Sequence, residues 1–114
     1  MNQFVALVVE DDALQRDFLA ELLKDEGLEV VECTTAEAAE LVISTAGPEL
    51  LALVTDVNLE GAMTGVELAE FAKQKFPLLT VVVLSGKPVP KLPDNTLFLA
   101  KPYQPKALLA AILN

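Results

Sequence analysis

Histidine and tryptophan are absent from this chain of 114 residues, and cysteine occurs once, as Cys33. Without histidine the chain has no imidazole to act as a general base, as part of a Ser-His triad or as a metal ligand. A single cysteine forms neither an internal disulfide nor a cysteine-based zinc site, so we expect Cys33 to pack as a small core residue. Any bound metal is therefore expected to be a hard cation held by oxygen.

Basic residues are also scarce: 8 Lys and Arg stand against 17 Asp and Glu, which gives a net charge of −9. An acidic chain does not attract a phosphate backbone, so we expect no direct binding to nucleic acid. No apolar run approaches the ~18–20 residues of a membrane span. Residues 1–4 also lack the basic start of a signal peptide. We expect a cytoplasmic protein without a membrane segment.

The length and composition suit one globular domain covering residues 1–114. Hydrophobic residues make up 53% of the chain, which is well above the content of disordered proteins. Apolar runs bounded by turn residues predict five strands, of which the first and the third are expected to be buried. These runs cover residues 4–9, 28–33, 51–56, 79–84 and 96–100.

Helical patterns separate the predicted strands. Helices are predicted over residues 13–26, from after Thr34 to about Thr45, over 65–76 and from Pro105 onward. In the fourth connection Pro88, Pro90 and Pro93 exclude a regular helix, so the fourth helix should be short or missing. Alternating strands and helices predict an α/β fold with a doubly wound, five-stranded parallel sheet. We expect the flavodoxin-like strand order 2-1-3-4-5.

The spacing of apolar residues predicts which side of the first helix faces the core. In the first helix Leu14, Phe18 and Leu22 recur at four-residue spacing with Leu19 and Leu23 beside them, which predicts a core-facing stripe.

The second helix is expected to begin with a capping box of Thr34 and Glu37. Its core face is expected to contain Leu41 and Val42.

Polar side chains follow four of the five strands. The acidic run 10–12 ends the first strand, and Asp56, Ser85 and Lys101 end the third, fourth and fifth. In a parallel sheet these groups meet at one edge, where α/β proteins bind ligands. Carboxylates from neighbouring strands repel one another unless a proton or a cation is present. Such an all-oxygen cluster suits Mg²⁺.

The chemistry that this cluster predicts is phosphoryl transfer. An aspartate carboxylate can act as a nucleophile and form an aspartyl phosphate, which makes Asp56 the candidate acceptor. Transfer depends on positioning and charge neutralisation. Mg²⁺ held by Glu10, Asp11 and Asp56 would supply part of that neutralisation. Lys101 would add a positive charge, and Ser85 would add a hydroxyl group.

These motifs carry a family resemblance. They are Leu7–Asp12 followed by Arg16, Thr55-Asp56, Leu84–Gly86 and Lys101–Tyr103. Over its whole length the chain resembles the receiver domain of bacterial two-component response regulators, either stand-alone or within a hybrid kinase.

The resemblance implies that Asp56 accepts a phosphoryl group from a histidine kinase or a histidine phosphotransfer protein. It also implies that Mg²⁺ binds Glu10, Asp11, Asp56 and the backbone carbonyl of Asn58. Ser85 and Lys101 would engage the phosphoryl group, and the domain would phosphorylate and dephosphorylate only itself rather than turn over a substrate. The missing histidine fits, because the donor imidazole then comes from another protein or domain.

The chain departs from the family pattern in two segments. The loop after Asp56 is longer than usual and lacks a proline, and the segment between Ser85 and Lys101 is shorter than usual. Phe98 stands where the family has its switch aromatic, so we expect Ser85 and Phe98 to form the switch. The resemblance implies that a downstream protein partner binds Pro88–Tyr103 and the last helix. It is also compatible with a homodimer.

Two other functions remain open from the sequence. The first is an interaction module with a receiver fold that works without phosphorylation, which the altered segments would suit. The second is a Mg²⁺-dependent phosphohydrolase with an Asp nucleophile. Against this hydrolase, Asn58 stands two residues after Asp56, where such an enzyme would place a general acid.

Overall fold

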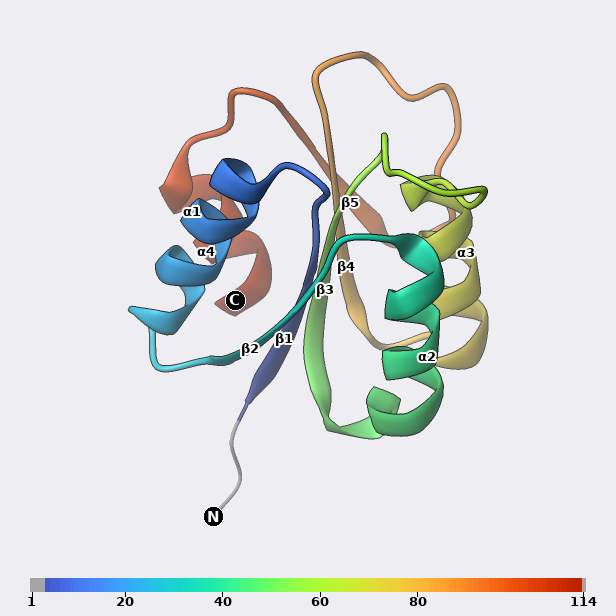
Figure 1. Ribbon diagram of the computed structural model, residues 1–114, viewed down its shortest axis with the longest axis horizontal. Helices are drawn as coiled ribbons and strands as arrows, with labels where there is room; N and C mark the ends of the chain where they lie inside the picture. Colours follow the sequence, from blue (N-terminus) through green and yellow to red (C-terminus); the bar gives the residue numbers. More distant parts are fainter. Residues whose placement is uncertain (1–3, 114) are drawn as a thin grey trace.

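One five-stranded parallel sheet runs through the protein, and its strand order is β2-β1-β3-β4-β5 (Figure 1). The computed structural model describes residues 4–113. The strands are β1 (Val5–Val9), β2 (Glu29–Cys33), β3 (Leu50–Asp56), β4 (Thr80–Ser85) and β5 (Thr96–Ala100). The helices are α1 (Ala13–Lys24), α2 (Ala36–Ala46), α3 (Gly65–Lys75) and α4 (Pro105–Leu113), with a short 3₁₀ helix, η1 (Gly47–Glu49). The predicted fold class and strand order are confirmed.

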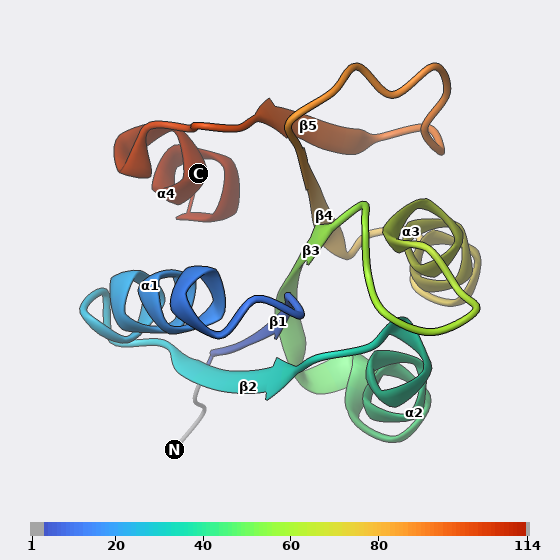
Figure 2. The same cartoon turned by 45° about the horizontal axis from the view of Figure 1, so that its top comes forward.

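The helices form a layer on each face of the sheet. Figure 2 shows α1 and α4 on one face and α2 and α3 on the other. Alternate residues of each strand point to opposite faces, so β1 contributes Leu7 and Val9 to one core and Ala6 and Val8 to the other. The predicted core position of Cys33 is confirmed, since its thiol is free and buried. This sandwich leaves the carboxyl ends of the strands open at one edge.

Helix α1 begins directly after the acidic run at the end of β1. The Asp12 side chain accepts a hydrogen bond from the Gln15 amide at 3.1 Å, which satisfies one of the free N–H groups of the first turn. The predicted core stripe of α1 is wrong at two positions: Leu14 is 82% exposed and Phe18 is 52% exposed. The helix instead turns Leu19, with Ala20 and Leu23, toward the sheet.

Helix α2 corrects two further predictions. Its N-cap is Thr35, whose hydroxyl accepts from the Ala38 amide, and not Thr34. Leu41 is 69% exposed, whereas Ile43 is fully buried and Val42 packs against the core. The buried face of α2 is formed by Ala36, Ala39 and Ile43, which recur at the three- to four-residue spacing of a helix.

The connection between β4 and β5 contains no helix in the described part of the chain, as predicted. Residues 86–95 form an extended loop, and Leu92 from this loop packs against the core on the α2–α3 side. Because nothing larger covers β5 on that side, Phe98 is 39% exposed, and Leu97 on the other side is 44% exposed. Strand β5 is therefore an open edge of the sheet. Among residues 4–113 no helix has the length and apolar character needed to cross a membrane.

Candidate functional site

Three carboxylates gather where β1 and β3 end. Oxygen atoms of Glu10, Asp11 and Asp56 lie within 4.8 Å of one another. Glu10 is 1% exposed and Asp56 is 8% exposed. The parallel pairing of β1 with β3 brings the two strand ends together, as the sequence predicts. Buried carboxylates at this separation require a cation or a proton between them.

The backbone around Asp56 is tightly held. Its Oδ1 atom accepts a hydrogen bond from the Val57 amide at 3.0 Å. Gly65, at the start of α3, lies against the Asp56 carbonyl, where a Cβ atom would stand only 1.9 Å from the carbonyl oxygen. The Gly65 amide also donates to the Val57 carbonyl at 2.9 Å. A glycine at this position lets the helix approach the end of β3, which fixes the backbone that carries the Asp56 carboxylate.

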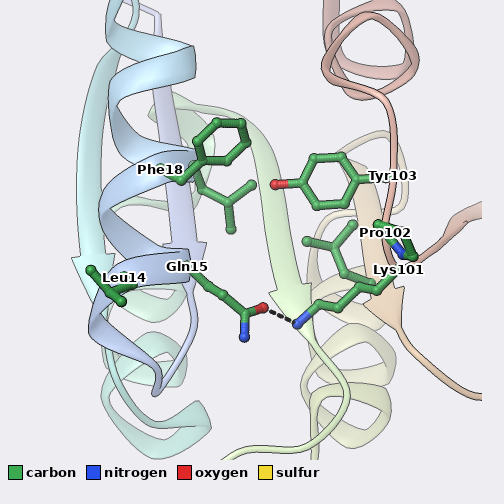
Figure 3. Close-up of a pocket in the computed structure, with 8 residues that line it drawn as sticks. Leu14, Gln15, Phe18, Lys101, Pro102 and Tyr103 are labelled. Carbon is green, nitrogen blue, oxygen red and sulfur yellow. Dashed lines mark hydrogen bonds between the residues drawn. The ribbon is translucent and has the colours of Figure 1, made fainter.

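Lys101 brings a positive charge from the end of β5 into the cluster. Its Nζ atom lies 3.2 Å from Asp56 Oδ1 and 3.1 Å from Glu10 Oε1. A third contact joins Nζ to Gln15 Oε1 at 2.6 Å (Figure 3). The Lys101 amide donates to the Ser85 carbonyl at 2.8 Å, so the end of β4 positions the lysine backbone. The peptide bond between Lys101 and Pro102 is cis.

The pKa values of two groups reflect this packing. Burial raises the pKa of Glu10 above its ordinary value, although its bonds to the Asp12 amide and to Lys101 act in the opposite direction. Burial acts to lower the pKa of Lys101, but the hydrogen bond to Glu10 and the charge of Asp56 outweigh it and raise that pKa. The lysine therefore stays charged beside the carboxylates.

Ser85 is buried at the end of β4, and its hydroxyl accepts a hydrogen bond from the Lys87 amide at 3.1 Å. The pairing of Asp56 with Leu84 across β3 and β4 places Ser85 one residue beyond the level of Asp56. Asn58 lies in the exposed loop after β3, and Phe98 lies on β5 away from the carboxylates. The roles of Asn58 as a ligand and of Phe98 as a switch stay predictions.

The loop between β3 and α3 has an anchor that the sequence reading missed. Glu37 Oε2, near the start of α2, accepts hydrogen bonds from the amides of Ala62 and Met63 at 3.0 and 3.1 Å. A hydrogen bond from its own backbone amide lowers the pKa of Glu37, and the bonds from Met63 and Ala62 act in the same direction. A β-bridge between Thr35 and Glu60 joins the same two segments. The longer, proline-free loop is thus tied to α2.

Gln15 was also missed. It is the third residue of α1, three residues after the N-cap Asp12, and its place in the first turn beside the acidic run is the one signal in the sequence that could have found it. In isolation a glutamine in the first turn of a helix is indistinguishable from a solvated surface residue.

A groove adjoins the cluster between α1 and the segment after β5. Its volume is about 530 Å³. Leu14 and Phe18 line one wall, Pro102 and Tyr103 line the other, and Lys101 lies at one end (Figure 3). In Figure 3 the Tyr103 hydroxyl points across the groove toward α1. The groove is mostly apolar and opens next to the acidic cluster.

The residues present fit a magnesium ion. Mg²⁺ prefers carboxylate oxygen and water over nitrogen or sulfur, and the cluster offers oxygen ligands from Glu10, Asp11 and Asp56. Asp11 is only partly buried, which leaves room for water on that side. The donor set therefore matches the predicted cofactor.

Comparison with known proteins identifies the family. The model of the response regulator receiver domain matches residues 6–113. The chain belongs to this family, which acts in two-component signalling.

The relatives include full-length regulators. The chain is 31% identical over 87 residues to a putative NtrX-like response regulator of Rickettsia conorii, with 75% of this chain and 18% of that protein covered. It is 31% identical over 109 residues to the response regulator protein FleR of Pseudomonas aeruginosa, with 90% of this chain and 22% of that protein covered. The chain thus spans about a fifth of the length of these curated relatives.

Solved structures agree with the fold. The receiver domain of the hybrid histidine kinase CckA is 28% identical, with a TM-score of 0.83 and coverage of 96% of this chain and 95% of that one. A receiver protein of Sinorhizobium medicae has a TM-score of 0.87 at 22% identity, with 97% and 92% coverage, which supports the fold alone.

Proposed function

We propose that residues 1–114 form one receiver domain in which Asp56 accepts a phosphoryl group from a histidine kinase or a histidine phosphotransfer protein. The observation that carries this proposal is the 3.2 Å contact between Asp56 Oδ1 and Lys101 Nζ inside a cluster with Glu10 and Asp11. An acceptor carboxylate, an ammonium group and further acidic ligands are the parts that phosphoryl transfer to an aspartate requires.

The transfer step uses the Asp56 carboxylate as the nucleophile. One carboxylate oxygen forms a bond to phosphorus as the P–N bond of the donor phosphohistidine breaks. The electron pair of that bond stays on the imidazole nitrogen, which then takes up a proton from solvent. Lys101 stabilises the negative charge on the phosphoryl oxygens, and Ser85 offers its hydroxyl to another of them. The domain would act on itself and release no product from a separate substrate.

Magnesium would be held by Glu10, Asp11, Asp56 and the carbonyl of Asn58. When bound, the ion would supply further neutralisation of phosphoryl charge. Without it, three carboxylates face a single ammonium group, since Lys101 is the cation within reach of both Glu10 and Asp56. The chain's own residues thus leave an excess of negative charge, which favours a divalent cation.

The donor would dock on the groove beside α1. The chain has no histidine, so the phosphohistidine must approach Asp56 from another protein or domain. When this donor protein docks, it would cover the surface next to Lys101, where Leu14 and Phe18 are exposed. Burial of these side chains and Tyr103 against a donor helix would contribute affinity next to the reacting atoms.

A downstream partner would bind the surface formed by Pro88–Tyr103 and α4. The alternative is that a second copy of this chain binds the same surface and forms a homodimer. The open edge of β5 and the exposed side chains of Leu97 and Phe98 also favour a second function, an interaction module that needs no phosphorylation. In that case partner affinity would not change on Asp56→Asn substitution or on removal of Mg²⁺. In a phosphorylation switch both changes would alter partner affinity after phosphorylation.

Incubation with acetyl phosphate and Mg²⁺, followed by intact-mass measurement, tests the acceptor. We expect a gain of one phosphoryl group that requires Mg²⁺ and disappears in Asp56→Asn. Asp25→Asn is the matched control, because Asp25 is an exposed aspartate that directly follows α1. A mass gain that survives Asp56→Asn, or no gain in the unmodified protein, would contradict the proposal.

A further inference from the structure

The Lys101 ammonium group has three acceptors within hydrogen-bond range. They are Gln15 Oε1 at 2.6 Å, Glu10 Oε1 at 3.1 Å and Asp56 Oδ1 at 3.2 Å. A lysine ammonium has three N–H donors and no acceptor. While Asp56 carries no phosphoryl group, the ammonium therefore makes hydrogen bonds to Gln15 and Glu10 and an ion pair with Asp56. To bind a phosphoryl oxygen, Lys101 must release one of these partners.

The three acceptors are not equivalent. The Glu10 and Asp56 side chains are 1% and 11% exposed, and both are carboxylates. After the transfer Asp56 is an acyl phosphate and no longer a carboxylate, whereas Glu10 keeps its buried charge, and separating that charge from its cation is strongly unfavourable. Gln15 is neutral and exposed, so water can hydrate its carbonyl oxygen once the lysine leaves. Gln15 is accordingly the partner that is released at the lowest free-energy cost.

The position of Gln15 also suits this role. Its backbone amide is bound to Asp12 Oδ1, which fixes the first turn of α1 beside the acidic cluster. Figure 3 shows its side chain reaching from α1 across the groove to the tip of Lys101. Because lysine only donates hydrogen bonds, the atom of the Gln15 amide that faces Nζ must be the carbonyl oxygen.

We propose that Gln15 is a positioning residue that holds Lys101 in the unphosphorylated state and competes with the phosphoryl group for its ammonium. This inference rests on the proposed phosphorylation of Asp56. The phosphoryl group brings three strong acceptor oxygens, and one of them replaces Gln15 Oε1 on the lysine. The number of hydrogen bonds on Lys101 is conserved in this exchange. Gln15 thereby lowers the affinity of the site for a phosphoryl group.

Titration with beryllofluoride, a phosphoryl mimic, in the presence of Mg²⁺ tests this competition by calorimetry. Gln15→Met removes the acceptor and keeps a side chain of similar length. We expect Gln15→Met to tighten beryllofluoride binding by about three- to tenfold, the change that one net hydrogen bond represents. Gln15→Glu provides a charged acceptor and should weaken binding. The affinity of Gln15→Met for Mg²⁺ alone should equal that of the unmodified protein.

The same Gln15→Met substitution in a Lys101→Met background is the control. If Gln15 acts through the lysine, it has no effect there, and the two changes are non-additive. An unchanged beryllofluoride affinity in Gln15→Met, or an equal change in both backgrounds, would overturn the role of Gln15. Failure of the unmodified protein to bind beryllofluoride would instead count against phosphorylation of Asp56 itself.

Discussion

Tyr103 is the single tyrosine of a chain that has no tryptophan, so its phenol can be followed without interference. Burial in the groove and the nearby charge of Glu10 raise the pKa of Tyr103 to about 12, from an ordinary value of 10.0. We expect its tyrosinate absorbance to remain low at pH 10 in the folded protein. A pH titration of that absorbance measures the shift.

The same shift affects the free energy of unfolding. Because the pKa is raised in the folded state, the stabilising contribution of the protonated phenol is fully present below pH 10 and is lost between pH 10 and about 12. The titration repeated in denaturant is the control and should return the ordinary midpoint. A folded-state midpoint equal to the denatured one would show that the phenol is in contact with water.

At the level of single residues, the sequence predicts the centre of the site better than its surroundings. Glu10, Asp56 and Lys101 stand at or directly after the ends of strands, and the parallel sheet alone brings strand ends together. Gln15 and Glu37 lie on helices, where their contacts depend on the rotation of the helix and on the path of a loop. No local pattern in the sequence specifies those two quantities.

Among the junctions between elements, the one between β3 and α3 is packed so closely that it has no space for a side chain on Gly65. A Cβ atom on Gly65 would stand 1.9 Å from the Asp56 carbonyl oxygen, and backbone cannot move aside as the end of a flexible side chain can. We expect Gly65→Ala to reduce the free energy of unfolding by about 1–3 kcal/mol, as overpacking in cores does. Urea unfolding measures this change.

Gly86→Ala is the matched control in the loop after β4. No heavy atom lies within 4 Å of a Cβ atom built on Gly86, so the same substitution has space there. Because alanine restricts the unfolded chain more than glycine does, we expect no loss of stability and a gain of up to about 1 kcal/mol. Equal destabilisation by both substitutions would mean that the close approach at Gly65 is not the cause.

The helices also show where periodicity fails as a guide. In α1 two adjacent apolar stripes compete: Leu14 and Phe18 lie on one, and Leu19 and Leu23 lie on the other. Spacing alone does not distinguish a stripe that faces the core from one that borders a groove. Element order and type, in contrast, were predicted correctly, because five apolar runs separated by turn residues leave few alternatives.

For the whole molecule, the net charge of −9 and the acidic cluster lead us to expect that divalent cations stabilise the native state. An ion that binds only the folded state stabilises it by mass action. At Mg²⁺ concentrations 100 times Kd, the gain is about 2.7 kcal/mol. For a domain of this size that raises Tm by about 10 °C. Thermal unfolding with and without Mg²⁺ measures the shift.

Asp11→Asn provides the comparison. It removes a carboxylate that is only partly buried, so the fold should remain while the Mg²⁺-dependent rise in Tm becomes small. Chelation of Mg²⁺ should return the unmodified protein to its lower Tm. An equal rise in Tm for Asp11→Asn would place the stabilising ion elsewhere on the surface.

The missing fourth crossover helix leaves the two halves of the site on strands of different burial. Asp56 ends a strand buried on both faces, whereas Lys101 follows β5, an edge strand with no helix over one face. Local opening is easiest where few apolar contacts must break. We therefore expect local opening of the edge strand β5 to withdraw Lys101 from the carboxylates while β3 keeps Asp56 in place.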